Sequence, residues 1–161
     1  MPIKAFAAQN CSVARTLSVL GERWTMLVLR EVFLGNHRFD RIRAELGIAS
    51  NVLSDRLATL VEAGVLERRR YSERPDRFEY WLTETGLELQ AVLLELLKWG
   101  DAHMSPAGPP RVIVHTDCGE VIESKQICSH CGGELHARNV RSRLGPGATD
   151  EDRAAELRRA A

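Results

Sequence analysis

Residues 50–71 read SNVLSDRLATLVEAGVLERRRY, an amphipathic segment followed by a glycine and then by a basic, extended run. Apolar residues recur through 50–63 at helical spacing, Ser50 can cap that helix at its start, and Gly64 occupies the place of a left-handed C-terminal cap. The basic run contains three consecutive arginines: Arg68, Arg69 and Arg70. The stretch therefore predicts a helix that leads almost directly into a basic strand.

The residues before this stretch predict three more helices. No proline occurs from Ser12 to Arg74, and apolar residues at helical spacing mark two early helices and a short one over residues 38–46. Gly47 ends the short helix only three residues before Ser50. Two short helices joined by a tight, glycine-containing turn are typical of a helix-turn-helix.

The residues after Gly64 predict a hairpin. The runs VLERRRY (65–71) and RFEYWL (77–82) flank a segment whose Pro75-Asp76 favours a turn. A helix-turn-helix followed at once by a hairpin indicates a winged helix.

A long apolar helix is expected to follow the hairpin. Thr83-Glu84 opens the run TETGLELQAVLLELLKWGDAH, whose apolar arc is wider than one core contact requires. The excess apolar surface favours burial against a second subunit, and the alternative is a helix packed wholly on its own domain.

The chain divides by composition into four parts, and the predicted fold class is mainly α with small β elements. We expect a winged helix-turn-helix domain with the dimerisation helices (1–104), a linker (105–110), a small zinc-ribbon-like β module (111–144) and a flexible tail (145–161).

The composition and charge of the chain limit its expected location and its expected partners. No apolar run approaches the roughly 18 residues that span a bilayer, and the start MPIKAFAAQN lacks a secretory apolar region, so we expect a cytoplasmic protein without a membrane partner. Lys+Arg and Asp+Glu both total 22, which argues against indiscriminate binding of polyanions. A local DNA contact needs only a few well-placed cations and is still allowed.

The face of the 50–63 helix opposite its leucines is the predicted DNA-reading surface. Short polar side chains there match base edges in a major groove, Asn51 can bond adenine through two hydrogen bonds, and Ser50 at the helix start suits a phosphate. Arg56 lies at the flank and could reach a phosphate or pair with an acid. The candidates on this helix are Ser50, Asn51, Ser54, Asp55, Arg56 and Thr59.

The predicted wing adds a second set of candidates. Strand alternation places Arg69 on the face opposite Arg68 and Arg70, so these three cannot all touch DNA. Arg74 or Arg77, near the tip, is the best placed for a minor-groove or phosphate contact. An ion-paired hairpin in solvent is the alternative. The wing candidates are Arg68, Arg70, Arg74 and Arg77.

Four further motifs stand out: CSVARTLSVLGERWT, the LxxRL-like pattern of the 50–63 helix, EYWLTETG and a leucine-rich helix ending in KWG. Through these motifs the sequence resembles the HxlR-type bacterial transcription regulators from Cys11 to about Gly100. It implies a winged-helix homodimer, formed by the first and last helices of the domain, that represses or activates nearby genes. Trp81 departs from the family pattern, where a small polar residue is expected, and indicates either packing or an interface.

The same resemblance implies a redox-sensing role for Cys11, because some HxlR-type members sense oxidants, quinones or aldehydes through a matching cysteine. The thiolate is the reactive form, and a helix N-terminus favours it. Without a second cysteine in the domain, oxidation would join subunits, cap the thiol with a small molecule, or engage the distal cysteines. An inert, partly buried cysteine is the alternative.

A cysteine module follows the linker. The run VIVHTDCGEVIESKQICSHCGGEL (112–135) contains two pairs of potential metal ligands, His115 with Cys118 and Cys128 with Cys131. The ligands of each pair are separated by two residues and followed by glycine, as in a zinc knuckle. Together the two pairs predict a structural Cys3His zinc site. His130 or His136 could replace the first ligand, and a degenerate ribbon without metal is the alternative. The predicted ligands are His115, Cys118, Cys128 and Cys131.

These features favour a sequence-specific regulator that binds double-stranded DNA as a homodimer, with an effector that the sequence does not identify. The alternative function is a protein-interaction module that uses the winged helix and the ribbon without reading bases. An enzyme is not expected, since the sequence offers no paired catalytic carboxylates, no glycine-rich phosphate loop and no nucleophile with an evident base.

Overall fold

The computed structural model describes residues 9–160, which form eight helical and strand elements up to Met104 and three more beyond it. The contacts divide the chain into two compact units, the first ending at Leu94 and the second beginning at Glu95. None of the helices in the described residues is both long enough and apolar enough to cross a bilayer.

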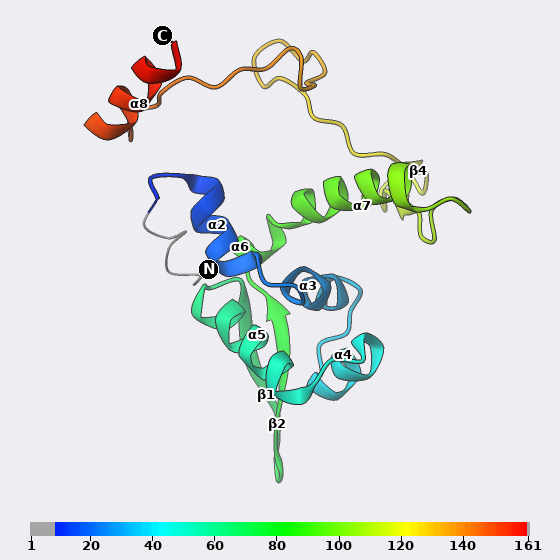
Figure 1. Ribbon diagram of the computed structural model, residues 1–161. Helices are drawn as coiled ribbons and strands as arrows, with labels where there is room; N and C mark the ends of the chain where they lie inside the picture. The colour runs from blue at the N-terminus through cyan, green and yellow to red at the C-terminus, as the bar shows by residue number, and fades with distance from the viewer. Residues whose placement is uncertain (1–8, 161) are drawn as a thin grey trace. The chain divides into compact units, whose positions relative to one another are not determined.

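Helices α2 (Ser12–Leu20), α3 (Thr25–Phe33), α4 (Phe39–Leu46) and α5 (Ser50–Glu62) build the first unit, and the helix-turn-helix is formed by α4 and α5 (Figure 1). Each helix turns an apolar face to one shared core. From α5 that face contributes Leu53, Leu57 and Leu60, which are at most 1% exposed. Truncating a leucine buried to this degree costs about 2–5 kcal/mol, so core packing fixes which face of α5 looks outward.

Glycines end two of these segments as the sequence predicts. Gly47 closes α4 with a φ of 61°, and Gly64 follows α5 with a φ of 69°, both in the left-handed region that favours glycine. The prediction that Ser50 caps α5 is wrong. Ala49 is the N-cap, in an extended conformation and without a side-chain cap bond, so that Ser50 is already the first helical residue.

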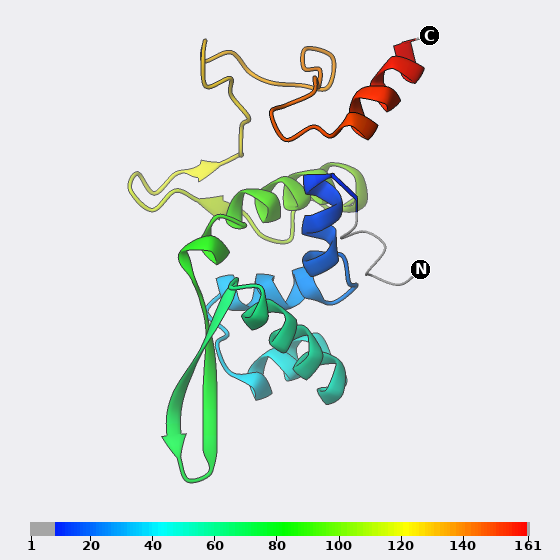
Figure 2. The same ribbon diagram turned by 90° about the vertical axis from the view of Figure 1, so that its left-hand side faces the viewer.

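Strands β1 (Leu66–Glu73) and β2 (Asp76–Leu82) form the predicted antiparallel wing, with Arg74 and Pro75 in the turn. Both views show this hairpin projecting beyond α4 and α5 (Figures 1 and 2). A β-bridge from Arg38 to Glu79 adds the start of α4 to the free edge of β2. The backbone before α4 therefore anchors the base of the wing.

The helix expected after the hairpin is broken into two. Helix α6 (Glu84–Leu87) is a single turn, and α7 (Gln90–Met104) begins after a two-residue interruption. Thr83 caps α6 by accepting a hydrogen bond from the Gly86 N–H at 3.1 Å, and its hydroxyl donates to the Gly64 carbonyl at 2.6 Å. The Thr83 N–H also donates to the Val65 carbonyl, at 3.1 Å. These bonds hold α6 against the start of the wing.

Besides most of α7, the second unit contains one short hairpin and a terminal helix. Strands β3 (Ile113–Val114) and β4 (Val121–Ile122) pair antiparallel, and a further bridge joins Ile127 to Glu134. Ser124 donates to Glu95 at 2.8 Å and accepts through its carbonyl from Lys98 at 2.9 Å, which ties the hairpin region to α7.

Part of the segment predicted as a flexible tail is helical. Residues Asp150–Ala160 form helix α8. Its physical basis is a capping box, since the Thr149 N–H donates to Asp152 at 2.7 Å and the Asp152 N–H donates back to the Thr149 hydroxyl at 3.2 Å. Acidic residues in the first turn add a favourable interaction with the helix dipole.

Candidate nucleic-acid interface

The outer face of α5 presents a cluster of short polar side chains. Ser50, Asn51, Ser54 and Asp55 are exposed, and all lie opposite the buried leucines. Within the described part of the chain, the side chains of Asn51, Ser54 and Asp55 have no hydrogen-bond partner, so their polar groups are available to a ligand. A major groove admits an α-helix, and short polar side chains on its exposed face can reach the base edges there.

Two predicted candidates on α5 are engaged within the protein. Arg56 is only 19% exposed at its side chain and lies 3.6 Å from Glu22, which precedes α3. Thr59 is half-buried and donates its hydroxyl to the Asp55 carbonyl at 2.9 Å. Arg56 therefore supports the packing of α5 on the α2–α3 connection, and Thr59 lies at the edge of the outer face.

The sequence reading missed an arginine on α4. Arg43 is exposed, and its Nη1 donates to the Ser50 hydroxyl at 3.1 Å. The interaction places a cation beside the N-terminus of α5, where a phosphate is favoured. The helix-turn-helix geometry was the available signal, since the last turn of its first helix lies beside the start of the second.

The three consecutive arginines of β1 interact mainly within the hairpin. The Arg68 guanidinium lies over the Phe78 ring, 3.3 Å from its centroid, Arg69 pairs with Glu67, and Arg70 pairs with Asp76. Arg69 also lies 5.0 Å from the centroid of Trp81, on the face opposite Arg68, as strand alternation predicts.

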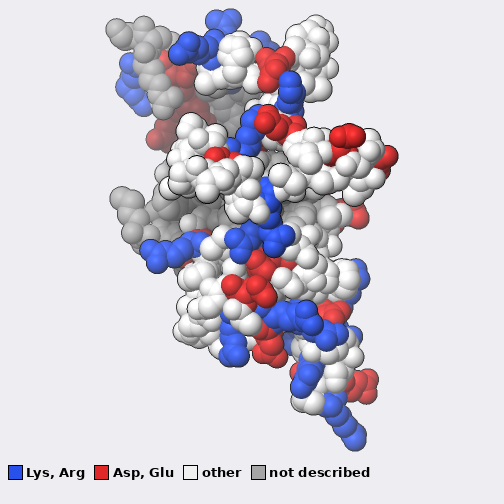
Figure 3. Space-filling model, turned by 90° about the vertical axis from the view of Figure 1, so that its right-hand side faces the viewer, with Lys and Arg blue, Asp and Glu red and all other residues white. Residues whose placement is uncertain are grey.

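The arginines at the wing tip are free. Arg74 and Arg77 are exposed, and in the described residues neither guanidinium has a hydrogen bond or an ion pair. Figure 3 shows basic side chains reaching the end of the projecting hairpin, with acidic side chains between them along its length. Of the wing candidates, Arg74 and Arg77 are therefore the two whose charge is not already compensated by an acid or covered by a ring.

Trp81 joins the wing to the helices. Its ring stacks on His37 with centroids 3.7 Å apart and planes 14° apart, and the His37 Nδ1 lies 3.1 Å from the Tyr80 carbonyl. Trp81 is half-buried, so packing explains its departure from the family pattern.

Glu79 links the same region to α4. It accepts a hydrogen bond from Arg38 at 2.9 Å and one from the Trp81 Nε1 at 3.3 Å. The hydrogen bond from Arg38 lowers the pKa of Glu79, and the same bond raises the pKa of Arg38. This ion pair and the Trp81 stack together fix the direction in which the hairpin projects.

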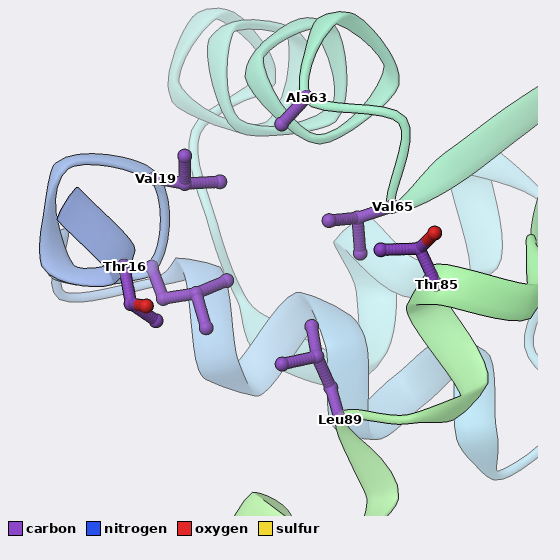
Figure 4. Close-up of a pocket in the computed structure, with 7 residues that line it drawn as sticks. Thr16, Val19, Ala63, Val65, Thr85 and Leu89 are labelled. Carbon is purple, nitrogen blue, oxygen red and sulfur yellow. The ribbon is translucent and has the colours of Figure 1, made fainter. Parts of the chain in front are cut away.

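A small hollow lies where α2, the end of α5 and the start of the wing meet (Figure 4). Its volume is about 170 Å³, and Thr16 and Thr85 supply the hydroxyl groups of an otherwise apolar lining. The apolar residues that line it are Val19, Leu20, Ala63, Val65 and Leu89. The hollow touches α2 and the C-cap residue of α5.

Cys11 is exposed and forms the N-cap of α2, with no side-chain cap bond. Cys11 thus lies at a helix start, as the sequence predicts, and its role as a redox sensor or as an inert cysteine stays a prediction.

In the segment with three cysteines, His115 lies beside Cys118 and Cys128 lies beside Cys131, each pair in its own turn. The His115 Nδ1 lies 3.2 Å from the Cys118 sulfur, and the backbone N–H groups of Cys131 and His130 lower the pKa of Cys128. Among the described residues, no three His, Cys, Asp or Glu side chains are grouped so that they could hold one metal ion. The structure thus shows two knuckle-like turns and does not show a zinc ribbon.

The comparisons with known proteins agree on one family. A sequence profile of HxlR-like helix-turn-helix proteins matches residues 19–108. The HTH-type transcriptional regulator Rv3095 of Mycobacterium tuberculosis is 48% identical to this chain over 137 residues, which cover 84% of this chain and 87% of that protein.

Solved structures extend the likeness. The crystal structure of PA1607 is 32% identical with a TM-score of 0.78, covering 88% of this chain and 99% of that one, so the likeness reaches into the second unit. The redox regulator HypR in its reduced form is 29% identical with a TM-score of 0.55, covering 59% of this chain and 95% of HypR.

The fold and these relatives define a winged helix-turn-helix regulator of transcription. The chain belongs to the HxlR-like helix-turn-helix family, which confirms the resemblance found in the sequence.

Proposed function

We propose that this protein regulates transcription by binding a specific operator in double-stranded DNA as a homodimer. The observation that carries the proposal is the outer face of α5, where Asn51, Ser54 and Asp55 are exposed and have no side-chain partner among residues 9–160. Asn51 can recognise adenine through two hydrogen bonds, and Asp55 can accept one from a cytosine amine.

Three arginines supply the phosphate contacts in this proposal. Arg43 lies at the N-terminus of α5, and Arg74 and Arg77 lie at the tip of the wing. Phosphate contacts orient a protein on the duplex, while base contacts select the sequence. A few placed cations suffice for this, so a net charge of zero is compatible with operator binding.

The homodimer is supported by apolar surface on two helices. Val13 and Leu17 on α2 are 67% and 47% exposed. On α7 no residue is buried, and Leu96 and Trp99 are 52% and 58% exposed. Apolar surface of this extent marks association, and a two-fold dimer reads two half-sites related by the same symmetry.

The test is footprinting on DNA from the neighbourhood of the protein's own gene. We expect a protected pseudo-palindrome with half-sites about 10 base pairs apart, and Asn51→Ala should abolish protection. Arg143→Ala, an exposed arginine of the second unit, is the matched control and should leave protection unchanged. The absence of any protected site, or full protection by Asn51→Ala, would refute operator reading by α5 and favour the alternative of a protein-interaction module.

We also infer that Cys11 is the residue through which an oxidant acts on this regulator. Its exposure at the N-cap of α2 and the likeness to the redox regulator HypR support this role. The Cys11 thiolate would attack the outer oxygen of a hydroperoxide, forming a sulfenic acid as the O–O bond breaks and an alkoxide leaves to take up a proton. Mass spectrometry after trapping with dimedone should find the adduct on Cys11, and its absence there would exclude this role.

A further inference from the structure

The two turns that hold the cysteines of the second unit have the same backbone. In the first turn the Gly119 N–H donates to the His115 carbonyl at 2.8 Å, and in the second the Gly132 N–H donates to the Cys128 carbonyl at 2.9 Å. Both glycines have a positive φ, 75° and 72° respectively. The turns are therefore structural repeats in which His115 corresponds to Cys128.

The correspondence continues into the flanking strands. The His115 N–H donates to the Glu120 carbonyl at 2.9 Å, and the Cys128 N–H donates to the Gly133 carbonyl at 2.7 Å. Each turn is thus closed by pairing on both sides, through β3 and β4 in the first case and through the bridge from Ile127 to Glu134 in the second.

The residue types at the four corresponding positions point to a metal rather than to disulfides. A disulfide needs sulfur on both sides, so His115 could not take the place that Cys128 takes in the other turn. A metal ion accepts an imidazole nitrogen and a thiolate at equivalent positions, and tetrahedral sites with three cysteines and one histidine are typical of Zn²⁺.

The second unit also lacks another means of holding these turns together. Every buried apolar residue of the described chain lies at or before Leu66, so the second unit has no buried apolar core. Next to the turns, Val114, Val121 and Ile127 are 48%, 62% and 62% exposed. Small modules that cannot build a core commonly use a metal in its place.

We propose that the second unit binds one Zn²⁺ ion through His115, Cys118, Cys128 and Cys131, and that binding docks the two turns against each other. The structure forms each ligand pair in its own turn, so the ion would need to bring two preformed halves together. Docking would cover Val114, Val121 and Ile127, and the three cysteine thiols would release their protons as they bind the ion as thiolates. The site is structural, because its four ligands complete the tetrahedron.

The test uses the full chain loaded with Co²⁺ and then with Zn²⁺. One equivalent of Co²⁺ should give the intense visible absorption of a tetrahedral site, and Zn²⁺ should displace it. Each of Cys118→Ser, Cys128→Ser and Cys131→Ser should lower the sulfur-to-cobalt charge-transfer absorption by about a third, in proportion to the number of thiolate ligands. His115→Ala should weaken binding with three thiolates retained.

Matched histidines in the same segment test the ligand assignment. His130→Ala and His136→Ala should bind Co²⁺ like the unchanged protein, since neither corresponds to a cysteine of the repeated turn. Loss of binding in His136→Ala with binding intact in His115→Ala would overturn the assignment. Near-ultraviolet circular dichroism, to which Trp24, Trp81 and Trp99 contribute, checks that each variant is folded.

Docking needs a separate readout. In amide NMR spectra, Zn²⁺ should shift the Gly119 and Gly132 resonances together and saturate at one equivalent per chain. Shifts in one turn only, or saturation at two equivalents, would overturn the single shared site. These measurements do not depend on DNA, so their failure would leave the proposed operator binding untouched.

Discussion

His37 and Trp81 stack with their ring centroids 3.7 Å apart, and this contact joins the segment before α4 to the second strand of the wing. The bridge between Arg38 and Glu79 lies beside it. The helix-turn-helix and the wing are thereby connected at the base of the hairpin, while its tip is free to meet a ligand.

Replacing Trp81 should loosen the wing without removing a DNA contact. We expect Trp81→Ala to lower the free energy of unfolding by on the order of 1 kcal/mol beyond the loss of apolar area, because the stack on His37 is lost. Trp81→Phe keeps an aromatic ring and should retain most of the stability. Urea denaturation measures both, and equal destabilisation by the two variants would contradict a role for stacking.

The wing-tip arginines should be detectable through salt dependence. Arg74→Ala and Arg77→Ala should each reduce the slope of log affinity against log salt concentration by about 0.9, if each contacts one phosphate. Arg70→Ala is the matched control, since Arg70 already pairs with Asp76 and its loss should change the slope little. Fluorescence anisotropy over a salt series measures the slopes, and equal effects from all three variants would contradict this division of the wing.

The Arg38–Glu79 pair should make the wing sensitive to acid. The pKa of Glu79 is lowered by its hydrogen bond with Arg38, so the pair stabilises the fold above the unfolded-state pKa and loses this contribution as pH falls through the folded-state pKa. Glu79→Gln should therefore be less stable than the unchanged protein at about pH 7, and the difference should shrink toward about pH 3. Urea midpoints at the two pH values test the sign, and a difference that grows in acid would contradict it.

Gly86 should tolerate no side chain. A Cβ there would lie 2.2 Å from the Val65 carbonyl oxygen, so we expect Gly86→Ala to destabilise the protein by about 1–3 kcal/mol. Gly100→Ala on α7 is the control, because nothing lies within 4 Å of its added Cβ and helix propensity should stabilise it by about 1 kcal/mol. Thermal unfolding compares them, and a neutral Gly86→Ala would show that α6 can move away from Val65.

The exposed apolar residues of α2 and α7 should govern the oligomeric state. We expect Leu17→Glu and Leu96→Glu each to shift the protein from dimer to monomer, because each places a charge on a surface that association would bury. Leu157→Glu, on the exposed α8, is the matched control and should leave the dimer intact. Sedimentation analysis distinguishes the species, and a dimer that persists in both test variants would exclude these surfaces.

The sequence predicted the elements that local pattern determines. The leucines of α5 recur at helical spacing and so identify its outer face, and the positive φ of Gly47 and Gly64 follows from their positions after the helices. The interruption between α6 and α7 was not predicted in this way, and the Thr83 bonds that hold α6 reach the Gly64 and Val65 carbonyls, which are distant in sequence.

The candidate site shows the same division. The exposure of Asn51 follows from the helical periodicity of the sequence. The ion pairs of Arg56 with Glu22 and of Arg70 with Asp76 depend instead on which acidic side chain the fold brings close to each arginine. The sequence analysis missed the bridge that pairs Arg38 with Glu79 on the free edge of β2, because a single bridged residue has no alternating pattern. The acidic start and basic end of the last segment suit a short helix, but composition does not show the capping box between Thr149 and Asp152 that α8 has in the structure.

Thr83 has one further consequence. Its hydroxyl and N–H bind two consecutive carbonyls, those of Gly64 and Val65, at the place where the reading helix ends and the wing begins. A displacement of α6 would therefore also displace the junction between α5 and β1, because one residue bonds both carbonyls. We expect the orientation of α5 relative to β1 to respond to the segment that leads into α7.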